Sequence, residues 1–415
     1  MATTRRLFTT SALAAPLLRP SPQSPAAEML RGLKPITPPP TPISDQEREA
    51  RIEKARRLMV DNKIGAIIVE PGSTMMYFTA TRWGRSERTF ALVLPARGEP
   101  AFVVPGFEEG RAREVIRFTK DIRIWQEDES PYERIAEVLR DRGVRTGRIG
   151  FEETVRFFVF DGIRKTAPAY ECVSADPVTA GCRIIKSPAE LALLERANEI
   201  TLAAIRAAST TVRDGMMQAE FSANLQAAFR ALGAPGGGLV IFGKYTASPH
   251  GTIEPQRLRE GDFVLVDAGC TVEGYVADVT RTFVFGKPTD RQRKIWELER
   301  KAQDAVLAAA RPGVTCESLD AVARKVVTDA GFGPDYRLPG LPHRTGHGVG
   351  LDGHEWTNLV RGNKTLLAPG MCFSDEPTIA IPGEFGIRLE DCFHVTGDSA
   401  RMFTPQSESI DHPFA

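Results

Sequence analysis

The sequence predicts a small α/β domain followed by a larger α+β domain. Helical and strand-like segments alternate up to about residue 175, as they do in α/β domains. Two long helical segments follow, and beyond them apolar runs separated by turn residues predict antiparallel hairpins. We therefore expect a leader and tether over residues 1–43, the first domain over 44–180 and the second domain over 181–415.

The N-terminal 43 residues differ in kind from the rest of the chain. Arg5 and Arg6 precede a short apolar run over residues 11–18, a pattern that resembles a bacterial twin-arginine (Tat-type) export signal. This pattern predicts a periplasmic or exported protein. The alternative is a disordered basic tail on a cytoplasmic protein. The proline-rich segment 34–42 is expected to be extended and unpacked.

The first domain opens with a predicted helix. Ser44 is its N-cap, and Glu47 stands at the capping-box position three residues later. A strand-like run over residues 66–70 follows the helix. The apolar runs 90–95 and 100–105 then predict a hairpin around four intervening turn residues.

The second domain begins near Arg183 with two predicted helices over residues 188–211 and 217–232. A glycine run over residues 236–238 comes next, without the strand–loop–helix context of a phosphate-binding loop. We interpret this run as a loop that leads into a strand containing Val240.

Two acidic residues interrupt apolar, strand-like runs of the second domain. Asp267 lies within residues 263–269, and Asp278 lies within residues 275–283. The midpoint between them falls beside Gly274, where glycine favours a tight turn. A hairpin with this centre would place the two carboxylates directly opposite each other.

A second pair of acids, Glu376 and Glu390, has its midpoint at Gly383 within another turn-like stretch. Like charges opposite each other in a sheet repel, and burying unpaired carboxylates either costs free energy or raises their pKa values. A bound cation removes both problems, and four carboxylates match the charge of two divalent metals. The alternative is that these are ordinary strand acids on a solvated face.

His347 lies on the chain between the two acidic pairs and could add one nitrogen ligand. A set of oxygen ligands with one imidazole favours Mn or Co, with Zn also possible. The sequence therefore predicts a site for two divalent metal ions, with Mn as the first expectation.

The acids and His347 fall within several motifs of the second domain. These motifs span residues 266–269, 274–282, 347–355, 375–377 and 386–391. They resemble those of the "pita-bread" metallopeptidases, in particular the branch of Xaa-Pro aminopeptidases and prolidases. The resemblance extends from about Gln46 to the C-terminus and implies a creatinase-like N-terminal α/β domain followed by a catalytic α+β domain of pita-bread fold.

The resemblance also implies a division of labour among the metal ligands. Asp278 and Glu390 would bridge the two metals, and Asp267 would hold one of them. His347 and Glu376 would hold the other metal. Glu376 would in addition carry a proton toward the leaving nitrogen.

Three further histidines match outer positions of this family. By resemblance, His250 approaches the scissile group, and His354 stabilises the developing tetrahedral centre. His343 would line the substrate pocket, with a purely structural histidine as the alternative. Arg388 precedes Glu390 by two residues and so lies on the same strand face. We expect it near the substrate and beside Glu390, and an ordinary ion pair is the alternative.

The activity implied by the resemblance is hydrolysis of the peptide bond before proline in a small peptide. We expect an Xaa-Pro aminopeptidase, because a dipeptidase needs a cation for the substrate's C-terminal carboxylate and the sequence identifies none. The connection from His347 to Glu376 leaves little room for an inserted arginine-bearing segment. Prolidase is the first alternative and a lyase of the same fold is the second. The resemblance further implies a homodimer.

The sequence departs from the family pattern near the expected substrate pocket. Thr378 follows Glu376-Pro377 where a glycine is usual, and Asp375 places an extra acid beside a ligand. Trp356 stands where a proline is common. These changes leave the ligand set intact and leave the substrate preference open. A metal-free creatinase-like enzyme or a binding module would be expected to lack part of that set.

Composition agrees with an enzyme that has substantial cores. Hydrophobic residues make up 42% of the 415 residues, and 53 basic residues balance 53 acidic ones. This balance gives no electrostatic case for a nucleic-acid partner. No stretch reaches the roughly 20 apolar residues that a membrane span needs. Among the six cysteines, Cys172 and Cys182 could pair if the protein is exported.

Overall fold

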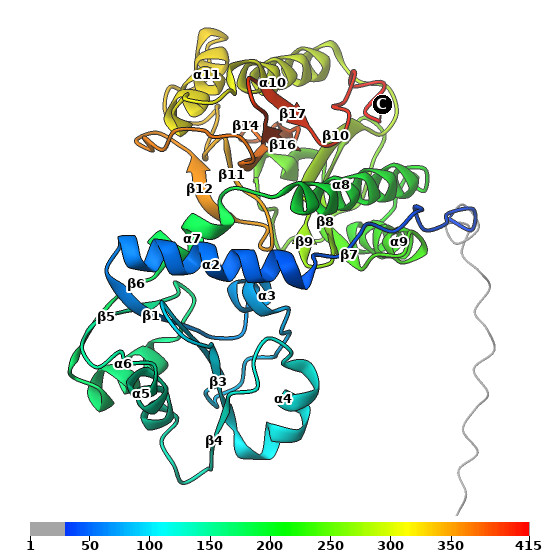
Figure 1. Cartoon of the computed structure of the whole chain (residues 1–415). Helices are drawn as coiled ribbons and strands as arrows, with labels where there is room; N and C mark the ends of the chain where they lie inside the picture. Colours follow the sequence, from blue (N-terminus) through cyan, green and yellow to red (C-terminus); the bar gives the residue numbers. More distant parts are fainter. Residues whose placement is uncertain (1–29, 415) are drawn as a thin grey trace, which may run out of the picture.

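The computed structural model describes residues 30–414. The predicted export signal therefore lies outside the described residues. The described chain forms two lobes, a smaller one built mainly from residues 45–183 and a larger one that follows it (Figure 1). Helices α2 and α7 lie where the two lobes meet (Figure 1). Among residues 30–414, the helices are all too short or too polar to cross a membrane.

The N-terminal lobe is a mixed six-stranded sheet covered by helices on both faces. Its strand order is β4-β3-β2-β1-β5-β6. The strands are β1 (Ile64–Val69), β2 (Ala91–Pro95), β3 (Ala101–Pro105), β4 (Ile122–Trp125), β5 (Gly147–Phe151) and β6 (Tyr170–Ser174). The antiparallel pairing of β2 with β3 confirms the predicted hairpin.

The helices of this lobe fall into two groups. Residues of α5 and α6 share a core with one face of the sheet, while residues of α2, α3, α4 and α7 share a core with the other face. The helices are α2 (Asp45–Asp61), α3 (Ser73–Thr79), α4 (Glu109–Val115), α5 (Pro131–Asp141), α6 (Phe157–Thr166) and α7 (Asp176–Arg183). As predicted, the Ser44 side chain accepts a hydrogen bond from the Glu47 N–H at the start of α2.

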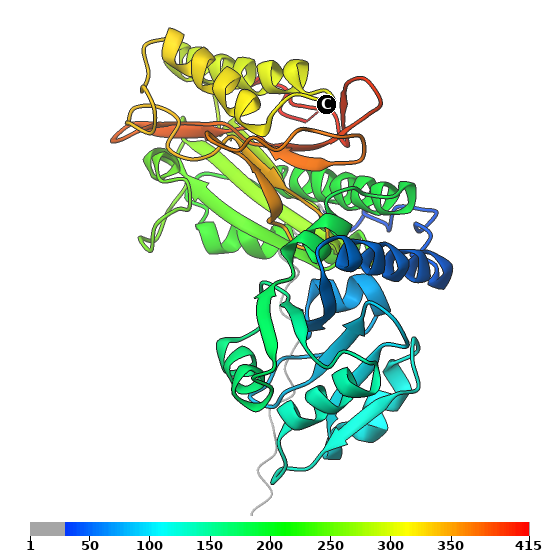
Figure 2. The same cartoon turned by 60° about the vertical axis from the view of Figure 1, so that its left-hand side comes forward.

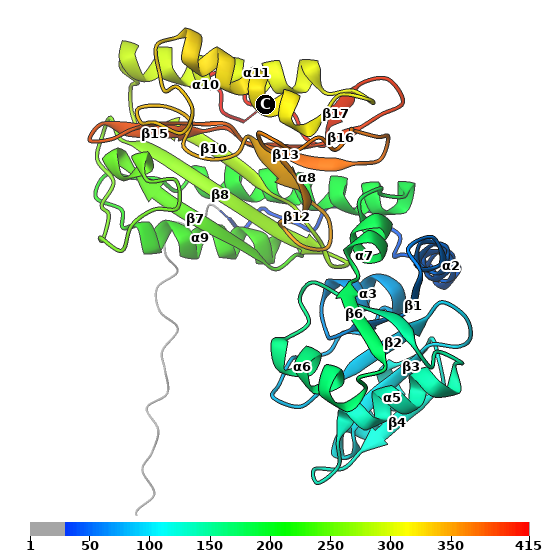
Figure 3. The same ribbon diagram turned by 90° about the vertical axis from the view of Figure 1, so that its left-hand side faces the viewer.

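The larger lobe packs two sheets between two pairs of helices (Figures 2 and 3). Helices α8 and α9 cover the sheet of β7, β8 and β10, and α10 and α11 cover the sheet of β11 to β13, β16 and β17. The helices are α8 (Pro188–Ser209), α9 (Gln218–Ala231), α10 (Asp290–Ala309) and α11 (Cys316–Asp329). This arrangement, together with the N-terminal sheet, matches the predicted fold class.

The strands of the larger lobe bring distant parts of the sequence together. The first sheet contains β7 (Gly236–Phe242), β8 (Phe263–Val272), β9 (Tyr275–Val276) and β10 (Val279–Val284). The second contains β11 (Gly346–Gly348), β12 (Glu355–Leu359), β13 (Cys372–Asp375), β16 (Asp391–Val395) and β17 (Ala400–Met402), with the hairpin β14 (Thr378–Ile381) and β15 (Phe385–Arg388) beside it. A bridge between Thr280 and Glu390 joins the two sheets.

The glycine run 236–238 forms the first half of β7, so the prediction of a loop is wrong. Close packing of the neighbouring strand explains two of the glycines. A Cβ atom at Gly238 would lie 2.2 Å from the backbone oxygen of Asp267. The close approach of β8 therefore explains Gly236 and Gly238, which need no turn conformation, but it does not explain Gly237.

The proline-rich segment 34–42 forms no helix or strand and most of its residues are exposed, as expected, but it is held against the larger lobe. Leu30 is buried in the core formed by α8 and α9, and Ile36 packs against the same core. The Arg196 guanidinium on α8 donates hydrogen bonds to the carbonyl oxygens of Ile36 (3.0 Å) and Pro38 (2.7 Å). Leu30 and Ile36 thus hold the segment against α8 and α9, which its composition does not predict.

Cys172 and Cys182 do not pair in this structure, and each is a free thiol. They pack into different cores: Cys182 belongs to the core around α2 and α7, while Cys172 packs against the core around α5 and α6. The N-terminal sheet lies between these two cores, which explains why the two thiols remain apart.

Candidate metal and active site

The residues predicted as metal ligands converge between the two sheets of the larger lobe. Their oxygen and nitrogen atoms form overlapping groups within 4.8 Å of one another. One group is Asp267, Asp278 and Glu390, and another is His347, Glu376 and Glu390. They line a cavity of about 300 Å³. The same cavity is lined by His250, His343, His354 and Arg388, so the structure brings all the predicted site residues together. It is also lined by Arg344, which was not predicted.

The hairpin that carries Glu376 and Glu390 has the predicted register. Ile381 pairs with Phe385 at one end of the hairpin, and Asp375 pairs with Asp391 beyond the two glutamates. Both pairings are centred on Gly383, whose φ of 84° is one that residues with side chains rarely adopt. Glu376 and Glu390 thus lie opposite each other where the ladder is interrupted.

The hairpin that carries Asp267 and Asp278 differs from the prediction by one residue at its centre. Val272 pairs with Tyr275, and Asp267 pairs with Thr280 instead of Asp278. The turn residues Glu273 and Gly274 both have positive φ, the conformation of a two-residue hairpin turn. Because the shift moves Asp278 by two positions along the partner strand, both carboxylates remain on the same face.

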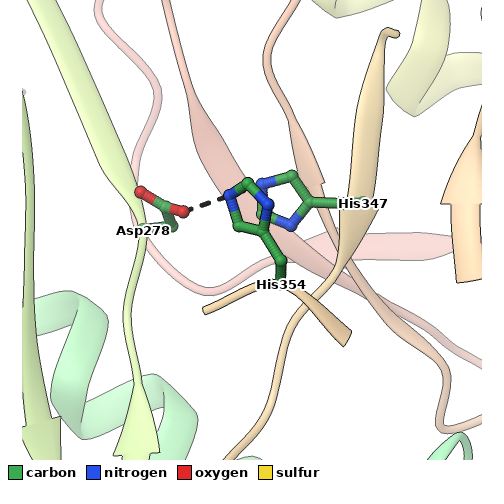
Figure 4. A group of neighbouring side chains, drawn as sticks. All are labelled: Asp278, His347 and His354. Atoms are coloured by element: carbon green, nitrogen blue, oxygen red, sulfur yellow. Dashed lines mark ion pairs between the residues drawn. The ribbon is translucent and has the colours of Figure 1, made fainter. Parts of the chain in front are cut away.

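His347 lies beside Asp278 of one acidic hairpin (Figure 4) and contacts Glu376 of the other. Its Nε2 lies 3.0 Å from Glu376 Oε1 and 3.7 Å from Asp278 Oδ2. Its backbone N–H donates to the Ser374 hydroxyl (3.0 Å), which in turn donates to Glu376 Oε1 (3.2 Å). Ser374 on the short strand β13 therefore holds both the backbone of His347 and the carboxylate of Glu376.

The acids of the cavity carry opposing electrostatic effects. Burial raises the pKa of Asp278 well above its ordinary value, and Asp267 and Glu376 raise it further. Burial also raises the pKa of Glu390, with Asp278 as the next cause. Burial alone would raise the pKa of Glu376, but its hydrogen bond with His347 and the charge of His347 outweigh that effect and lower it. Buried carboxylates that repel one another in this way fit a site for divalent cations.

Arg388 supplies the protein's own cation to one of these acids. Its guanidinium pairs with Asp267 Oδ2 at 2.5 Å and donates to the Thr280 hydroxyl at 3.2 Å. The Thr280 hydroxyl donates to Glu390 Oε2 at 2.6 Å, so Arg388 reaches Glu390 only through it. Another N–H of the guanidinium donates to the Pro249 carbonyl (3.1 Å) and holds the loop that carries His250. These bonds match the alternative of an ordinary ion pair and leave little for a substrate.

His354 and Arg344 also line the cavity, and His354 forms a third group of ligand atoms within 4.8 Å with Asp278 and His347. The imidazole of His354 stacks on that of His347 with 3.8 Å between the ring centroids (Figure 4). Arg344 donates to His354 Nδ1 at 2.8 Å. Burial and the neighbouring His347 lower the pKa of His354, which favours the neutral ring. Since an arginine can only donate, the neutral ring carries its proton on Nε2.

His343 is satisfied by the protein itself. Its Nδ1 lies 2.6 Å from the carbonyl oxygen of Arg344, and its Nε2 lies 2.9 Å from the Thr378 hydroxyl. A carbonyl oxygen only accepts, so Nδ1 donates and Nε2 accepts from Thr378. The threonine that departs from the family pattern thus has a partner, and this geometry favours the structural alternative for His343.

Comparisons with known proteins agree with this site. The model of metallopeptidase family M24 matches residues 192–397, and the model of the creatinase/prolidase N-terminal domain matches residues 51–185. An Xaa-Pro dipeptidase of Pyrococcus furiosus is 30% identical over 368 residues, which cover 87% of this chain and 99% of that protein. An Xaa-Pro dipeptidase of Lactobacillus delbrueckii subsp. lactis is 32% identical, with 86% and 98% covered.

The solved structure of dipeptidase PepE from Mycobacterium ulcerans is also similar. It superposes with a TM-score of 0.81 at 30% identity and covers 89% of this chain and 98% of that structure. The chain therefore belongs to metallopeptidase family M24, with a creatinase-type N-terminal domain and a catalytic domain of pita-bread fold. It is a hydrolase of the Xaa-Pro peptidase group and depends on metal.

Proposed function

We propose that the protein is an Xaa-Pro dipeptidase that holds two divalent metal ions, Mn in the first place, with Asp267, Asp278, His347, Glu376 and Glu390. The relatives named Xaa-Pro dipeptidase favour this specificity over the aminopeptidase that the sequence alone suggested. The observation that carries the proposal is that one cavity is lined both by the clustered carboxylates and by Arg344, a cation that forms no ion pair within residues 30–414.

The clustered carboxylates and His347 would supply the metal ligands. Asp278 and Glu390 each belong to two of the ligand groups, and their carboxylates repel each other. Both properties are expected of carboxylates that would bridge two metal ions. Divalent ions held there would polarise the scissile carbonyl and lower the pKa of a bound water. Ser374 keeps Glu376 beside His347, and from this place Glu376 would carry a proton to the proline nitrogen that leaves.

The histidines would act on the scissile carbonyl. His354 presents its Nε2–H, since Arg344 occupies Nδ1, and would donate to the carbonyl oxygen as negative charge develops. His250 would approach the same group from the loop that Arg388 holds. We assign no direct substrate contact to Arg388, because Asp267, Thr280 and Pro249 occupy its guanidinium.

Arg344 would bind the substrate's C-terminal carboxylate. Within residues 30–414 it forms no ion pair, and its side-chain hydrogen bond to His354 uses only one of five N–H groups. A guanidinium with free donors at the cavity is suited to a carboxylate, which it can bind with two hydrogen bonds. This residue supplies the cation that a dipeptidase requires and that the sequence did not identify.

Three further features complete the proposal. We infer that residues 44–180 and 181–415 act as the two domains, and that two chains form a homodimer. We also retain a twin-arginine export signal in the first 43 residues, with a cytoplasmic protein as the alternative. Light scattering of the purified protein and fractionation of cells that express the full chain test the last two inferences.

The test is product release by Mn-loaded protein from Ala-Pro, Ala-Pro-Ala and Ala-Ala-Ala. A dipeptidase cleaves Ala-Pro and leaves the two tripeptides nearly intact. Cleavage of Ala-Pro-Ala instead would restore the aminopeptidase. If none of the three is cleaved although metal is bound, the peptidase specificity proposed here is wrong, and a lyase reaction becomes the next candidate. Glu390→Gln serves as the inactive control.

A further inference from the structure

The turn over residues 348–355 carries His354 and lies where the two lobes meet. Glu355 folds its carboxylate back against this turn: Oε1 accepts hydrogen bonds from the N–H of Leu351 (2.7 Å) and of Asp352 (3.3 Å). Gly350 leaves room for it, because a Cβ atom there would lie 2.5 Å from the carboxylate. The carboxylate thus shapes the chain immediately before His354.

Two buried cations hold this carboxylate in place. Lys186 Nζ lies 2.9 Å from Glu355 Oε2, and Arg183 pairs with Oε1. The side chains of Lys186 and Glu355 are only 2% and 5% exposed, so solvent screens their attraction weakly. Burial alone would raise the pKa of Glu355, but the charges of Lys186 and Arg183 outweigh it and lower the pKa to about 2.

The same cluster reaches into the N-terminal lobe. Arg183 also pairs with Asp352 Oδ2 at 2.6 Å and donates to the Thr74 hydroxyl at 3.0 Å. The Ser73 hydroxyl donates to Asp352 Oδ1 at 2.5 Å. Ser73 and Thr74 form the start of α3, so a helix of the N-terminal lobe holds the turn that carries a cavity histidine.

None of Arg183, Lys186 and Glu355 lines the metal cavity, so the proposed chemistry gives them no role. His354 nevertheless depends on the backbone that they fix, since its ring must stay stacked on His347 and within reach of Arg344. A displacement of about 1 Å at such a position can cost on the order of 10²-fold in rate.

We propose that Glu355, clamped by Lys186 and Arg183, is a positioning residue that sets the place of His354 in the cavity and ties it to the N-terminal lobe. The proposal rests on the proposed function insofar as His354 acts there on the scissile carbonyl. It assigns a catalytic purpose to the lobe that contributes no metal ligand.

The experiment compares Glu355→Gln with wild-type protein in two measurements. The first is Ala-Pro hydrolysis, alone and in a His354→Ala background. We expect Glu355→Gln to lower kcat by about 10- to 100-fold with KM within about threefold, and to have little further effect once His354 is removed. The second is histidine side-chain NMR of the metal-free protein. The chain has six histidines, and the spectrum of His354→Ala assigns the His354 signal. We expect the His354 signal to shift.

Glu190→Gln is the matched control. Glu190 is also buried at the lobe junction, beside Arg51 and Tyr275, but it has no bond to the 348–355 turn. It should destabilise the protein without moving the His354 signal or kcat. If Glu355→Gln prevents folding, Lys186→Met, which leaves the Arg183–Glu355 pair intact, takes its place in both measurements.

The two measurements separate failure of this inference from failure of the proposed function. An unshifted His354 signal, or a kcat loss that persists undiminished without His354, would overturn the positioning role. Wild-type protein that does not cleave Ala-Pro would instead overturn the proposed function, and the NMR comparison would still decide whether Glu355 positions His354.

Discussion

Glu355 at the lobe junction and the pair Asp278 and Glu390 in the cavity are buried carboxylates whose surroundings shift their pKa values in opposite directions. At the lobe junction, Lys186 and Arg183 lower the pKa of Glu355 to about 2. In the cavity, burial and mutual repulsion raise the pKa values of Asp278 and Glu390. The junction is balanced by the chain's own cations, whereas the cavity holds more negative charge than Arg388 compensates. The balance of charge thus separates a structural cluster from a site prepared for added cations.

The largest expected effect comes from Glu390→Gln in the cavity. We expect Ala-Pro hydrolysis to fall by on the order of 10³-fold or more, because a shared metal ligand is lost. The metal-free variant should unfold at a higher temperature than metal-free wild type, since a repelled buried carboxylate is gone. Added Mn²⁺ should stabilise wild type but not the variant in thermal scans. A variant that is destabilised without metal would contradict the comparison.

Glu355→Gln at the junction should show the opposite sign. A pKa lowered from 4.5 to about 2 corresponds to about 3 kcal/mol of unfolding free energy at neutral pH. Because the folded-state pKa is the lower one, this contribution is complete above pH 4.5 and is lost as the pH falls toward 2. Urea unfolding of wild type and variant should therefore differ most at neutral pH and converge in acid. A constant difference across this range would show that the carboxylate's charge is not the cause.

Arg344→Gln tests whether the guanidinium at the cavity binds the substrate's C-terminal carboxylate. We expect KM for Ala-Pro to rise about 10- to 100-fold, the effect of losing a hydrogen-bonded charge pair of about 1.5–3 kcal/mol. Ala-Pro amide, which lacks the carboxylate, should be cleaved equally well by wild type and variant. Equal losses on both substrates would mean that Arg344 acts through His354 and not on the carboxylate.

Asp375→Asn should have the smallest effect. Among the described residues, neither carboxylate oxygen of Asp375 has a hydrogen-bond partner, and the side chain does not line the cavity. Burial raises its pKa well above the ordinary value, with Asp391 as the next cause, so a neutral amide is a close substitute. We expect the free energy of unfolding and the kcat to change by no more than about 1 kcal/mol and about twofold. A large loss of activity would show that this acid belongs to the metal site.

The sequence was sufficient to predict which acids converge at the cavity, because the register of their hairpins follows from local turn chemistry. Gly383 marks the centre of the hairpin that places Glu376 opposite Glu390. The predicted centre of the other hairpin was wrong by one residue, because Glu273 adopts a positive φ that is unusual for glutamate. Both carboxylates nevertheless remain on the predicted face of the strands and reach the cavity.

Other features could not be read from the sequence because they depend on tertiary packing. Arg344 lies beside His343 in a motif already singled out, but only the fold shows that it has no acidic partner among the described residues and points at His354. The packing of the proline-rich segment depends on Arg196, about 160 residues away along the chain. Gly238 in β7 leaves room for the backbone of β8, and no local sequence pattern predicts this contact.

The most direct test of the central claim is a titration of metal-free wild-type protein with Mn²⁺, followed by calorimetry and by Ala-Pro hydrolysis on the same samples. We expect about two ions bound per chain and activity that rises with their binding. Glu390→Gln should lose both signals, while Glu190→Gln should keep them. Full hydrolysis before any metal binds, or tight binding that leaves Glu390→Gln unaffected, would contradict the central claim.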